Sequence, residues 1–324
     1  MSASSPGHVP VLAREVLDYL QVRPGETVVD ATIGLGGHAR LLAHAIGPTG
    51  TLVGLDVDPV NLESARAVLA DFAGRLELIH ANFVELPEVL RSLGIAGADV
   101  LFADLGICST QLDDANRGFS FQRDGSLDMR LDLRSKTTAG ELVNRLSEKD
   151  LGDLFYQNAQ EPGSRRIAKF ICAARRDGRI TTTGRLAKIV LDALGLAGES
   201  WSSRVHPATR TFLALRIAVN RELEKLESLL EIAPKLLTSG GRIGVIAFHS
   251  LEDKPVKLDF RRRKNEGVYA IVTKKPVVAD DDERRDNPRS RSAKLRVARR
   301  IADDVVGSVV DAVLNAGDEV DSDD

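Results

Sequence analysis

The chain has 324 residues, of which 43% are hydrophobic and 28% charged, a composition typical of globular proteins that fold in water. Its apolar runs are far shorter than the ~20 residues of a membrane span, and its first ten residues lack the basic and apolar regions of a secretory signal. We therefore expect a cytoplasmic protein with no membrane partner.

The net charge of −3 conceals an uneven distribution of charge. Residues 302–324 hold eight of the 47 acidic side chains and no lysine or arginine, so residues 1–301 carry 44 basic and 39 acidic groups, a net charge of +5. A mildly basic body suits a polyanionic partner, and the acidic segment 302–324 is predicted to be a disordered tail. The two cysteines, Cys108 and Cys172, lack metal-ligand spacing, so we expect reduced thiols and no metal site.

Short β-rich runs alternate with helical patterns in the first third of the chain. After the second run, Asp58 can cap a helix and Pro59 suits its first position. Strand–helix alternation at this spacing indicates βαβ units around a parallel sheet. The first four predicted strands are Thr27–Asp30, Thr51–Asp56, Leu76–His80 and Val100–Asp104.

The alternation then stops, and the next buried strand is predicted only at Arg242–Phe248, with 135 residues between Gly106 and Arg242. A crossover between parallel strands needs little more than ~10–12 residues. One long helix is predicted from near Pro207 to about Leu230, and the remaining gap has helical apolar spacing. The sequence thus predicts a discontinuous α/β domain, residues 1–111 and 206–301, with an all-helical insertion, residues 112–205.

Two further strands are predicted at Tyr269–Thr273 and Lys294–Ala298. Because side chains alternate along a strand, we expect Leu295 and Val297 to be buried while Lys294 and Arg296 point into solvent.

A loop with Gly34, Gly36 and Gly37 follows the first strand and precedes a helix. Glycine lets a ligand approach the backbone, and a helix N-terminus offers unpaired N–H groups; a tight turn without a ligand is the alternative. Asp56, which ends the second strand, can accept hydrogen bonds from both ribose hydroxyls of an adenosine. Asp30 suits the cationic S-adenosylmethionine and would repel a dinucleotide's diphosphate, which favours the methyl donor.

Further candidates lie at the carboxyl ends of the strands, where open α/β sheets bind ligands. His38 either faces the ligand or is an exposed residue of the first helical turn, and His249 alone is more often structural. Asp104 ends a buried strand, where a charge needs a partner, so we interpret it as functional. The other candidates are Asn82, Phe83 (an adenine-stacking or core residue), Gln111, Asp113, Asp114 and Ser250, with Arg216 and Asn220 on the long helix.

Two basic clusters lie in the last quarter of the body. Such runs usually cover solvated faces, but they also grip the phosphates of nucleic acids. The clusters are Arg261–Lys264 and the set Arg289, Arg291, Lys294 and Arg296.

Seven stretches, in order over about nine-tenths of the chain, resemble the ribosomal RNA small subunit methyltransferase H family, also called MraW. The RGFSF…DGSLDMR and FHSLED stretches are highly specific, whereas the glycine loop alone is not. The matching stretches are HVPVL (8–12), DATIGLGGHAR (30–40), DVDP (56–59), residues 104–132, residues 206–224, residues 240–257 and NPRSRSAKLR (287–296).

The resemblance implies a class I S-adenosylmethionine-dependent methyltransferase, Rossmann-like with a mostly parallel sheet, whose helical insertion recognises RNA. It implies methylation of the exocyclic amine N4 of a cytidine in the decoding region of small-subunit (16S) ribosomal RNA, with that RNA or the 30S subunit as partner. The implied donor-binding residues are Gly36, Gly37, His38, Asp56, Phe83, Asp104 and Gln111.

Residue roles follow from the chemistry of that amine, whose lone pair is delocalised into the ring. An acceptor for its N–H groups localises the lone pair. Asp104 is the expected acceptor, for the donor or for the amine, and His249 and Ser250 are expected to place the base. The residues expected to contact RNA are Arg289, Arg291, Lys294 and Arg296.

Two other functions and the oligomeric state stay open. One alternative is a non-catalytic RNA-binding assembly factor that keeps a donor fold. The other is a DNA cytosine methyltransferase, although the proline-proline-aromatic motif usual in those enzymes is replaced here by DLGICS, residues 104–109. A homodimer is one alternative for the oligomeric state.

Overall fold

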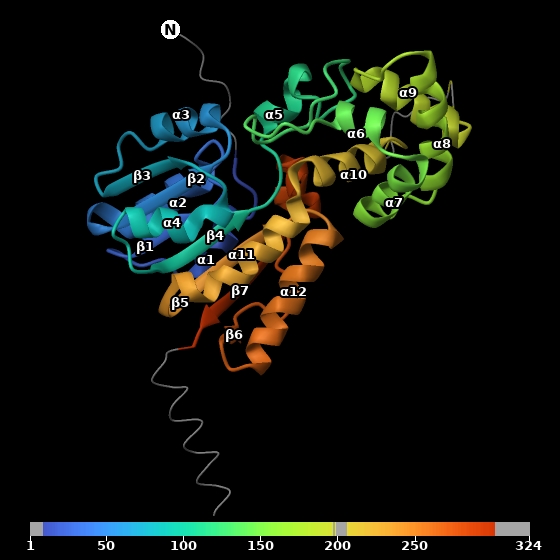
Figure 1. Ribbon diagram of the computed structural model, residues 1–324. Helices are drawn as coiled ribbons and strands as arrows, with labels where there is room; N and C mark the ends of the chain where they lie inside the picture. Colours follow the sequence, from blue (N-terminus) through green and yellow to red (C-terminus); the bar gives the residue numbers. More distant parts are fainter. Residues whose placement is uncertain (1–8, 197, 199–205, 302–324) are drawn as a thin grey trace, which may run out of the picture. The chain divides into compact units, whose positions relative to one another are not determined.

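The computed structural model describes residues 9–196, 198 and 206–301, which divide into two compact units (Figure 1). The first unit comprises the described parts of Met1–Gly106 and Leu226–Asp324, and the second is Ile107–Lys225. The predicted acidic tail, 302–324, lies outside the described residues. Among the helices that are described, none has the length and apolar character needed to cross a membrane.

A seven-stranded sheet in the order β3-β2-β1-β4-β5-β7-β6 forms the centre of the first unit. Strands β1 to β5 pair in parallel, whereas β7 runs antiparallel to both of its neighbours. This arrangement confirms the expected Rossmann-like class I fold. The strands are β1 (Thr27–Asp30), β2 (Thr51–Asp56), β3 (Arg75–His80), β4 (Ala98–Asp104), β5 (Leu237–Ala247), β6 (Tyr269–Ile271) and β7 (Lys294–Arg300).

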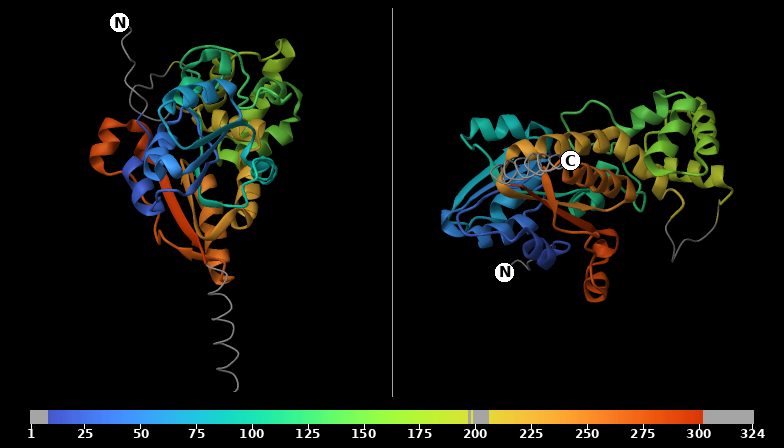
Figure 2. Two further views of the ribbon diagram at one scale, coloured as in Figure 1. Left: turned by 90° about the vertical axis from the view of Figure 1, so that its left-hand side faces the viewer. Right: turned by 90° about the horizontal axis from the view of Figure 1, so that it is seen from below.

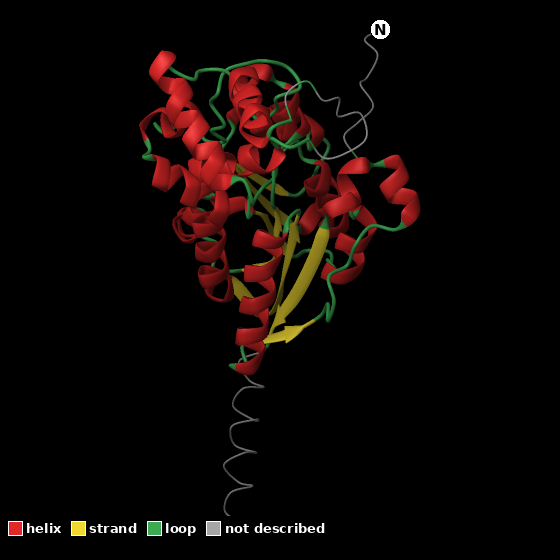
Figure 3. Ribbon diagram, turned by 90° about the vertical axis from the view of Figure 1, so that its right-hand side faces the viewer, coloured by secondary structure: helices red, strands yellow, loops and turns green. Residues whose placement is uncertain are grey.

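Helices cover both faces of this sheet, and Figure 3 shows strands in yellow with helices in red. Adjacent strand residues point to opposite faces, so Leu52 belongs to one apolar cluster with α1, α2 and α3, and Val53 to another with α4, α11 and α12. These helices are α1 (Ala13–Leu20), α2 (Gly37–Ile46), α3 (Pro59–Val68), α4 (Leu86–Ser92), α11 (Glu222–Leu236) and α12 (Ser250–Asn265); α13 (Asp281–Asp286) follows β6.

The predicted strands are confirmed, with different ends in several cases. β1 and β2 match the predicted bounds, and β3 and β4 begin one and two residues earlier. β5 begins at Leu237, five residues before the predicted start, so Gly240 and Gly241 lie within the strand and not in a turn. Gly240 has φ 77°, a conformation that favours glycine. Residues 238–241 include no large apolar side chain, so a hydrophobicity pattern does not reveal this part of the strand.

The second unit is built from helices and loops around its own apolar core (Figure 2, green to yellow). Buried side chains from four helices meet there, among them Phe155, Ile171, Val190 and Phe212. The helical pattern predicted for this segment is therefore confirmed. Its α-helices are α5 (Ser109–Asp113), α6 (Ala139–Arg145), α7 (Glu148–Ala159), α8 (Ser164–Ala174), α9 (Thr183–Leu194) and α10 (Thr209–Asn220).

The single long helix predicted after Pro207 is wrong. Arg221 adopts a left-handed conformation with φ 52°, which ends α10 and separates it from α11. Phe212 packs in the core of the second unit, whereas Leu226 packs in the core of the first. The inserted unit is accordingly wider than the predicted 112–205, because α10 belongs to it.

Candidate functional site

The loop after β1 needs glycine for two physical reasons. Gly34 and Gly36 have φ values of 52° and 85°, which side chains disfavour. A Cβ on Gly36 would also lie 3.1 Å from Cα of Ala65 in α3. No described side chain caps α2, and its first turn holds no acidic residue, so its first N–H groups suit an anionic ligand group.

Asp56 ends β2 and faces this loop. Its Oδ2 accepts hydrogen bonds from the backbone N–H of Gly34 (2.9 Å) and from Nδ2 of Asn61 (3.2 Å). Its Oδ1 accepts one from the backbone N–H of Asp58 at 2.8 Å. Burial raises the pKa of Asp56, although these hydrogen bonds oppose the shift. The carboxylate is thus fixed in orientation and still has acceptor capacity for ribose hydroxyls.

The buried side chains of Asp30 and His38 and the partly buried side chain of Asp104 form a group of titratable residues around the end of β1. Asp30 is 1% exposed, and burial raises its pKa to about 7, although the proximity of His38 lowers it. Near neutral pH this carboxyl is therefore partly protonated, which refines the prediction of a permanent negative charge. A cationic ligand beside it would favour the ionised form.

His38 is oriented by two contacts and is buried, so the alternative of an exposed first-turn residue is wrong. Its Nε2 donates to the backbone carbonyl of Val11 at 2.8 Å, and its Nδ1 lies 3.4 Å from Oδ2 of Asp104. Because a carbonyl only accepts, the Nε2 proton is fixed, and the Nδ1–Oδ2 contact requires one further shared proton. Burial lowers the pKa of His38, but the hydrogen bond and charge of Asp104 outweigh it and raise the pKa.

Asp104 ends β4, next to β1, where the strand order of the sheet reverses. Its backbone N–H donates to Oγ1 of Thr32 at 2.7 Å. One carboxylate oxygen, Oδ2, faces His38, while Oδ1 is buried and has no hydrogen-bond partner among the described residues. A buried acceptor in this state is costly unless a ligand supplies the donor, so Oδ1 marks a ligand position.

Asn82 and Phe83 follow β3. Asn82 caps the short 3₁₀ helix Phe83–Glu85, with its Oδ1 accepting from the backbone N–H of Val84 at 3.2 Å. Phe83 is partly buried and packs against the apolar cluster under α4 and α11. Asn82 is therefore structural, and Phe83 joins the core while keeping an exposed part.

His249 and Ser250 follow β5, the strand next to β4. His249 Nε2 lies 3.1 Å from Oε1 of Glu252, whose Oε2 accepts from the backbone N–H of Phe248 at 2.8 Å. Glu252 is only 3% exposed. Its buried carboxylate lies beside the His249 ring, whose two nitrogens have no hydrogen-bond partner among the described residues, and Ser250 is the exposed first residue of α12.

Five candidates lie in the second unit, and the expectation that three of them, Gln111, Asp113 and Asp114, come close to Asp104 stays a prediction. Gln111 is buried, with Oε1 accepting from the backbone N–H of Cys108 at 3.2 Å. Asp114 caps the 3₁₀ turn after α5, and Asp113 is exposed.

Arg216 and Asn220, on α10, make internal polar contacts. Arg216 forms a two-point ion pair with Glu222, with both N–O distances 2.9 Å. Asn220 accepts from the backbone N–H of Leu131 at 2.7 Å and donates to the carbonyl of Met129 at 2.8 Å. Asn220 is therefore engaged in internal hydrogen bonds and fixes the loop that contains the DGSLDMR stretch.

The basic set at the C-terminal end of the body is not uniform. Arg289 and Arg291 are exposed on the 3₁₀ helix Pro288–Ser292. Leu295 and Val297 are buried as predicted, but Arg296 is only 7% exposed and does not point into solvent. Its Nε donates to Oδ1 of Asp253 at 2.6 Å, so the prediction that its side chain points into solvent is wrong, and the guanidinium forms part of an internal ion pair.

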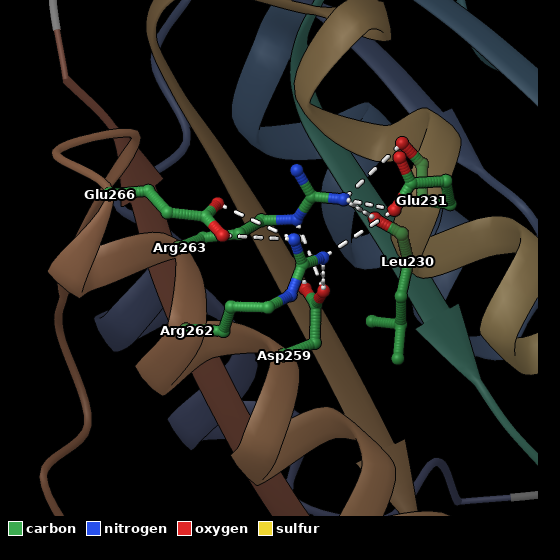
Figure 4. Close-up of polar contacts among 6 residues, drawn as sticks. All are labelled: Leu230, Glu231, Asp259, Arg262, Arg263 and Glu266. Atoms are coloured by element: carbon green, nitrogen blue, oxygen red, sulfur yellow. Dashed lines mark hydrogen bonds and ion pairs between the residues drawn. The ribbon is translucent and has the colours of Figure 1, made fainter.

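The basic run Arg261–Lys264 is also partly neutralised. Arg262 and Arg263 pair with Asp259 on the same helix, and Arg263 reaches Glu231 on α11 at 2.9 Å (Figure 4). This side of α12 has little net charge for binding RNA.

Three polar residues at the site escaped sequence reasoning. Thr32 bonds the Asp104 backbone, Asn61 orients Asp56, and Glu252 lies beside His249. Each acts on a residue that the sequence did single out; Thr32 and Glu252 lie in the recognised stretches DATIGLGGHAR and FHSLED, whereas Asn61 lies outside any such stretch. The glycine loop, the Asp56 acceptor and the buried carboxyl of Asp30 together fit a ligand with an adenosine and a cationic amino-acid end.

The sequence and the fold are similar to those of known proteins. A model of the MraW methylase family matches residues 5–301. The chain is 46% identical over 297 residues to the ribosomal RNA small subunit methyltransferase H of Acidobacterium capsulatum, covering 90% of this chain and 98% of that protein. It is 48% identical over 309 residues to the protein of the same name from Geobacter sulfurreducens, covering 91% and 99%. A solved rRNA methylase from Streptococcus thermophilus aligns with TM-score 0.43 at 12% identity, covering 91% of this chain and 99% of that one.

Proposed function

Since the chain belongs to the MraW methylase family and uses S-adenosylmethionine as its methyl donor, we propose that its acceptor is the exocyclic N4 of a cytidine. The cytidine lies in the decoding region of small-subunit (16S) ribosomal RNA, free or within the 30S subunit, in the cytoplasm. The names of the two relatives support small-subunit RNA as substrate. The unpartnered Oδ1 of Asp104 is the observation that supports an amine as the reacting group.

When bound, S-adenosylmethionine supplies an electrophilic methyl group on a positively charged sulfur. Transfer forms an N–C bond, breaks an S–C bond and releases one amine proton. Asp104 Oδ1 accepts a hydrogen bond from an N–H of the amine, which localises the nitrogen lone pair. The same oxygen then takes the proton that the amine releases. A buried carboxylate oxygen such as Oδ1 is a stronger acceptor than one in water, because water does not compete for it.

His38 acts on the reaction through Asp104. Its Nδ1 faces Oδ2, so the pair holds one shared proton before the reaction and takes up another when the amine is methylated. The fixed Nε2 bond to Val11 keeps the ring in this orientation. His38 is thus a positioning residue, with Asp104 as the catalytic residue.

The base reaches Asp104 after leaving its stack, because N4 of a stacked and paired cytidine is inaccessible to the site. His249 and Ser250 follow β5, and β5 lies beside β4 with Ile246 opposite Asp104. They are placed to contact the base, with Glu252 beside the histidine.

RNA recognition is assigned to two other parts of the chain. The helical unit Ile107–Lys225 is proposed to bind the RNA, with Gln111 as a donor contact by motif match. Arg289 and Arg291, both exposed, are proposed to contact phosphates, with a weaker contribution from half-buried Lys294.

The nucleoside product tests this function. Small subunits from cells lacking the protein, and DNA in a parallel reaction, are incubated with the purified protein and labelled S-adenosylmethionine. The nucleic acid is then digested to nucleosides for mass spectrometry. We expect one N4-methylated cytidine in the decoding region. Labelled DNA would favour a DNA cytosine methyltransferase, and unlabelled RNA with intact donor binding would favour a non-catalytic assembly factor. Asp71→Asn, which changes an exposed carboxyl, is the control and should match the parent protein.

A further inference from the structure

A small pocket in the first unit lies between α12 and the β6–β7 edge of the sheet. Its volume is about 50 Å³, several times the ~10–15 Å³ that one water needs. Four of its lining side chains are basic and none is acidic. The lining residues are Lys257, Phe260 and Arg261 of α12, Ile271, Thr273 and Lys274 in and after β6, and Arg296 of β7.

Three of these cations have no anionic partner within ion-pair distance among the described residues: Lys257, Arg261 and Lys274 are exposed. Lys257 and Arg261 are four residues apart on one helix, where like charges repel each other. The other side of the same helix is arranged differently, because Asp259 lies four residues before Arg263 and pairs with it (Figure 4). Helix α12 therefore neutralises one side internally and leaves the pocket side positive.

The fourth cation is held in place for a ligand. Nε and Nη2 of Arg296 donate hydrogen bonds to the two carboxylate oxygens of Asp253, at 2.6 and 3.2 Å. This ion pair fixes the guanidinium while Nη1 keeps its donors, since the described residues provide no hydrogen bond to it. A buried, oriented guanidinium beside three exposed cations is an arrangement suited to phosphate oxygens.

The pocket also lies toward the edge of the sheet that carries Asp104. In the sheet, Asp104 is opposite Ile246 of β5, and Arg296 is opposite Val245 of the same strand. From β4 to β6 there are three strand spacings, about 15 Å. An RNA strand with a base at Asp104 would therefore have backbone phosphates within reach of the pocket.

We propose that the pocket formed by Lys257, Arg261, Lys274 and Arg296 binds a backbone phosphodiester of the RNA substrate. The inference rests on the proposed function for its ligand, an RNA strand, and extends that function by naming where the strand is held. Free inorganic phosphate shares the chemistry of the ligand, so the test separates the two.

The test is the salt dependence of RNA binding by the triple variant Lys257→Gln/Arg261→Gln/Lys274→Gln. Each lost phosphate contact should reduce the slope of log affinity against log salt by about 0.7–0.9, so we expect a reduction of about 2. The matched control is Arg66→Gln/Arg91→Gln/Lys235→Gln, which removes three exposed charges elsewhere in the first unit and should keep at least most of the parent slope. Donor affinity should be unchanged in both variants, and this also reports correct folding.

Each remaining outcome decides the matter. Equal slopes for the triple variant and the parent would overturn the proposal. A parent that binds inorganic phosphate through these residues, with an unchanged RNA slope, would show a small-anion site and also overturn it. If the triple variant fails to fold, Lys274→Gln should lower the slope by about 0.7 and Lys274→Arg should restore it; no difference between them would contradict the proposal.

The product analysis separates this inference from the proposed function. N4-methylcytidine formed with an unchanged slope would leave the function standing and remove the pocket. A reduced slope with a different methylated nucleoside would keep the RNA-binding pocket and remove the assignment to cytidine N4.

Discussion

His38 Nδ1 lies 3.4 Å from Oδ2 of Asp104, while His38 Nε2 is occupied by the carbonyl of Val11. The pair therefore presents the opposite carboxylate oxygen, Oδ1, to whatever enters the site. It lies at the end of β4, beside the glycine loop that follows β1. Charge, orientation and burial thus converge on one atom.

Asp56→Ala should weaken S-adenosylmethionine binding by ten- to a hundredfold. The change removes the proposed ribose acceptors, and a pair of charge-assisted hydrogen bonds is worth about 1.5–3 kcal/mol. Calorimetry on the folded variant measures this directly. Asn61→Ala is the control, because it removes only one of the groups that orient Asp56 and should have a much smaller effect. Unchanged donor affinity in Asp56→Ala would place the adenosine elsewhere.

Donor affinity should rise with pH up to about 7 and then level off. Burial raises the pKa of Asp30 to about 7, His38 opposes the shift, and Asp104 and Asp56 add to it. A cationic ligand favours the ionised carboxylate, so binding below pH 7 must first expel a proton. Calorimetry between pH 6 and 8 should show this trend in the parent and a weaker trend in Asp30→Asn. An identical pH profile in that variant would show that Asp30 does not sense the donor.

The same shift predicts how stability changes with pH. Because the folded pKa of Asp30 exceeds its usual value of 3.8, its stabilising contribution is complete below about pH 4 and is lost as pH rises toward 7. The side chain introduced by Asp30→Asn cannot ionise. The melting temperature of this variant minus that of the parent should therefore be higher at pH 8 than at pH 5. A constant difference between the two melting temperatures would contradict this.

Arg296→Ala should destabilise the first unit by about 3 kcal/mol, because it leaves the carboxylate of Asp253 in the interior without its main partner. Lys294 Nζ lies 3.9 Å from Asp253 and limits the loss. Thermal unfolding of the single variant and of Arg296→Ala/Asp253→Ala measures the coupling. The double variant should recover part of the stability; no recovery would mean that the ion pair is not the cause.

Asn220→Ala should loosen the loop around Met129 and Leu131. The change removes the acceptor for the Leu131 N–H and the donor to the Met129 carbonyl. Each of these backbone groups that is left buried and unpaired costs about 1–3 kcal/mol of folding free energy. Hydrogen exchange at the Leu131 amide should accelerate markedly. Asn220→Asp keeps the acceptor for Leu131 and should preserve protection there, so equal exchange in both variants would argue against the assigned bonds.

Local sequence patterns predicted most of the first unit because its signals are short in range. Asp58 and Pro59 mark the start of α3, and the buried strands are continuous apolar runs. The break at Arg221 has no such signal, since the helical spacing of apolar residues continues through it into α11. Only the structure shows that the two halves of the stripe belong to different cores.

The site was predicted less completely than the fold. Asp30, Asp56 and Asp104 were recognised as candidates because each is a charged residue at the end of a strand, and His38 because it follows the glycine loop. The burial of Arg296 was missed, because strand alternation cannot show that Asp253, 43 residues earlier, supplies a partner. The basic pocket was missed for a related reason, since its cations come from three segments that only the fold brings together.

The most direct test of the central claim is the single-turnover rate of methyl transfer to small-subunit RNA by Asp104→Asn. If Oδ1 of Asp104 accepts a hydrogen bond from the amine N–H, the rate at saturating donor and RNA should fall by about 10²–10⁴-fold. The affinity for S-adenosylmethionine should stay within about threefold of the parent value. A rate close to that of the parent, or a loss fully explained by weaker donor binding, would contradict the claim and make Asp104 a donor contact only.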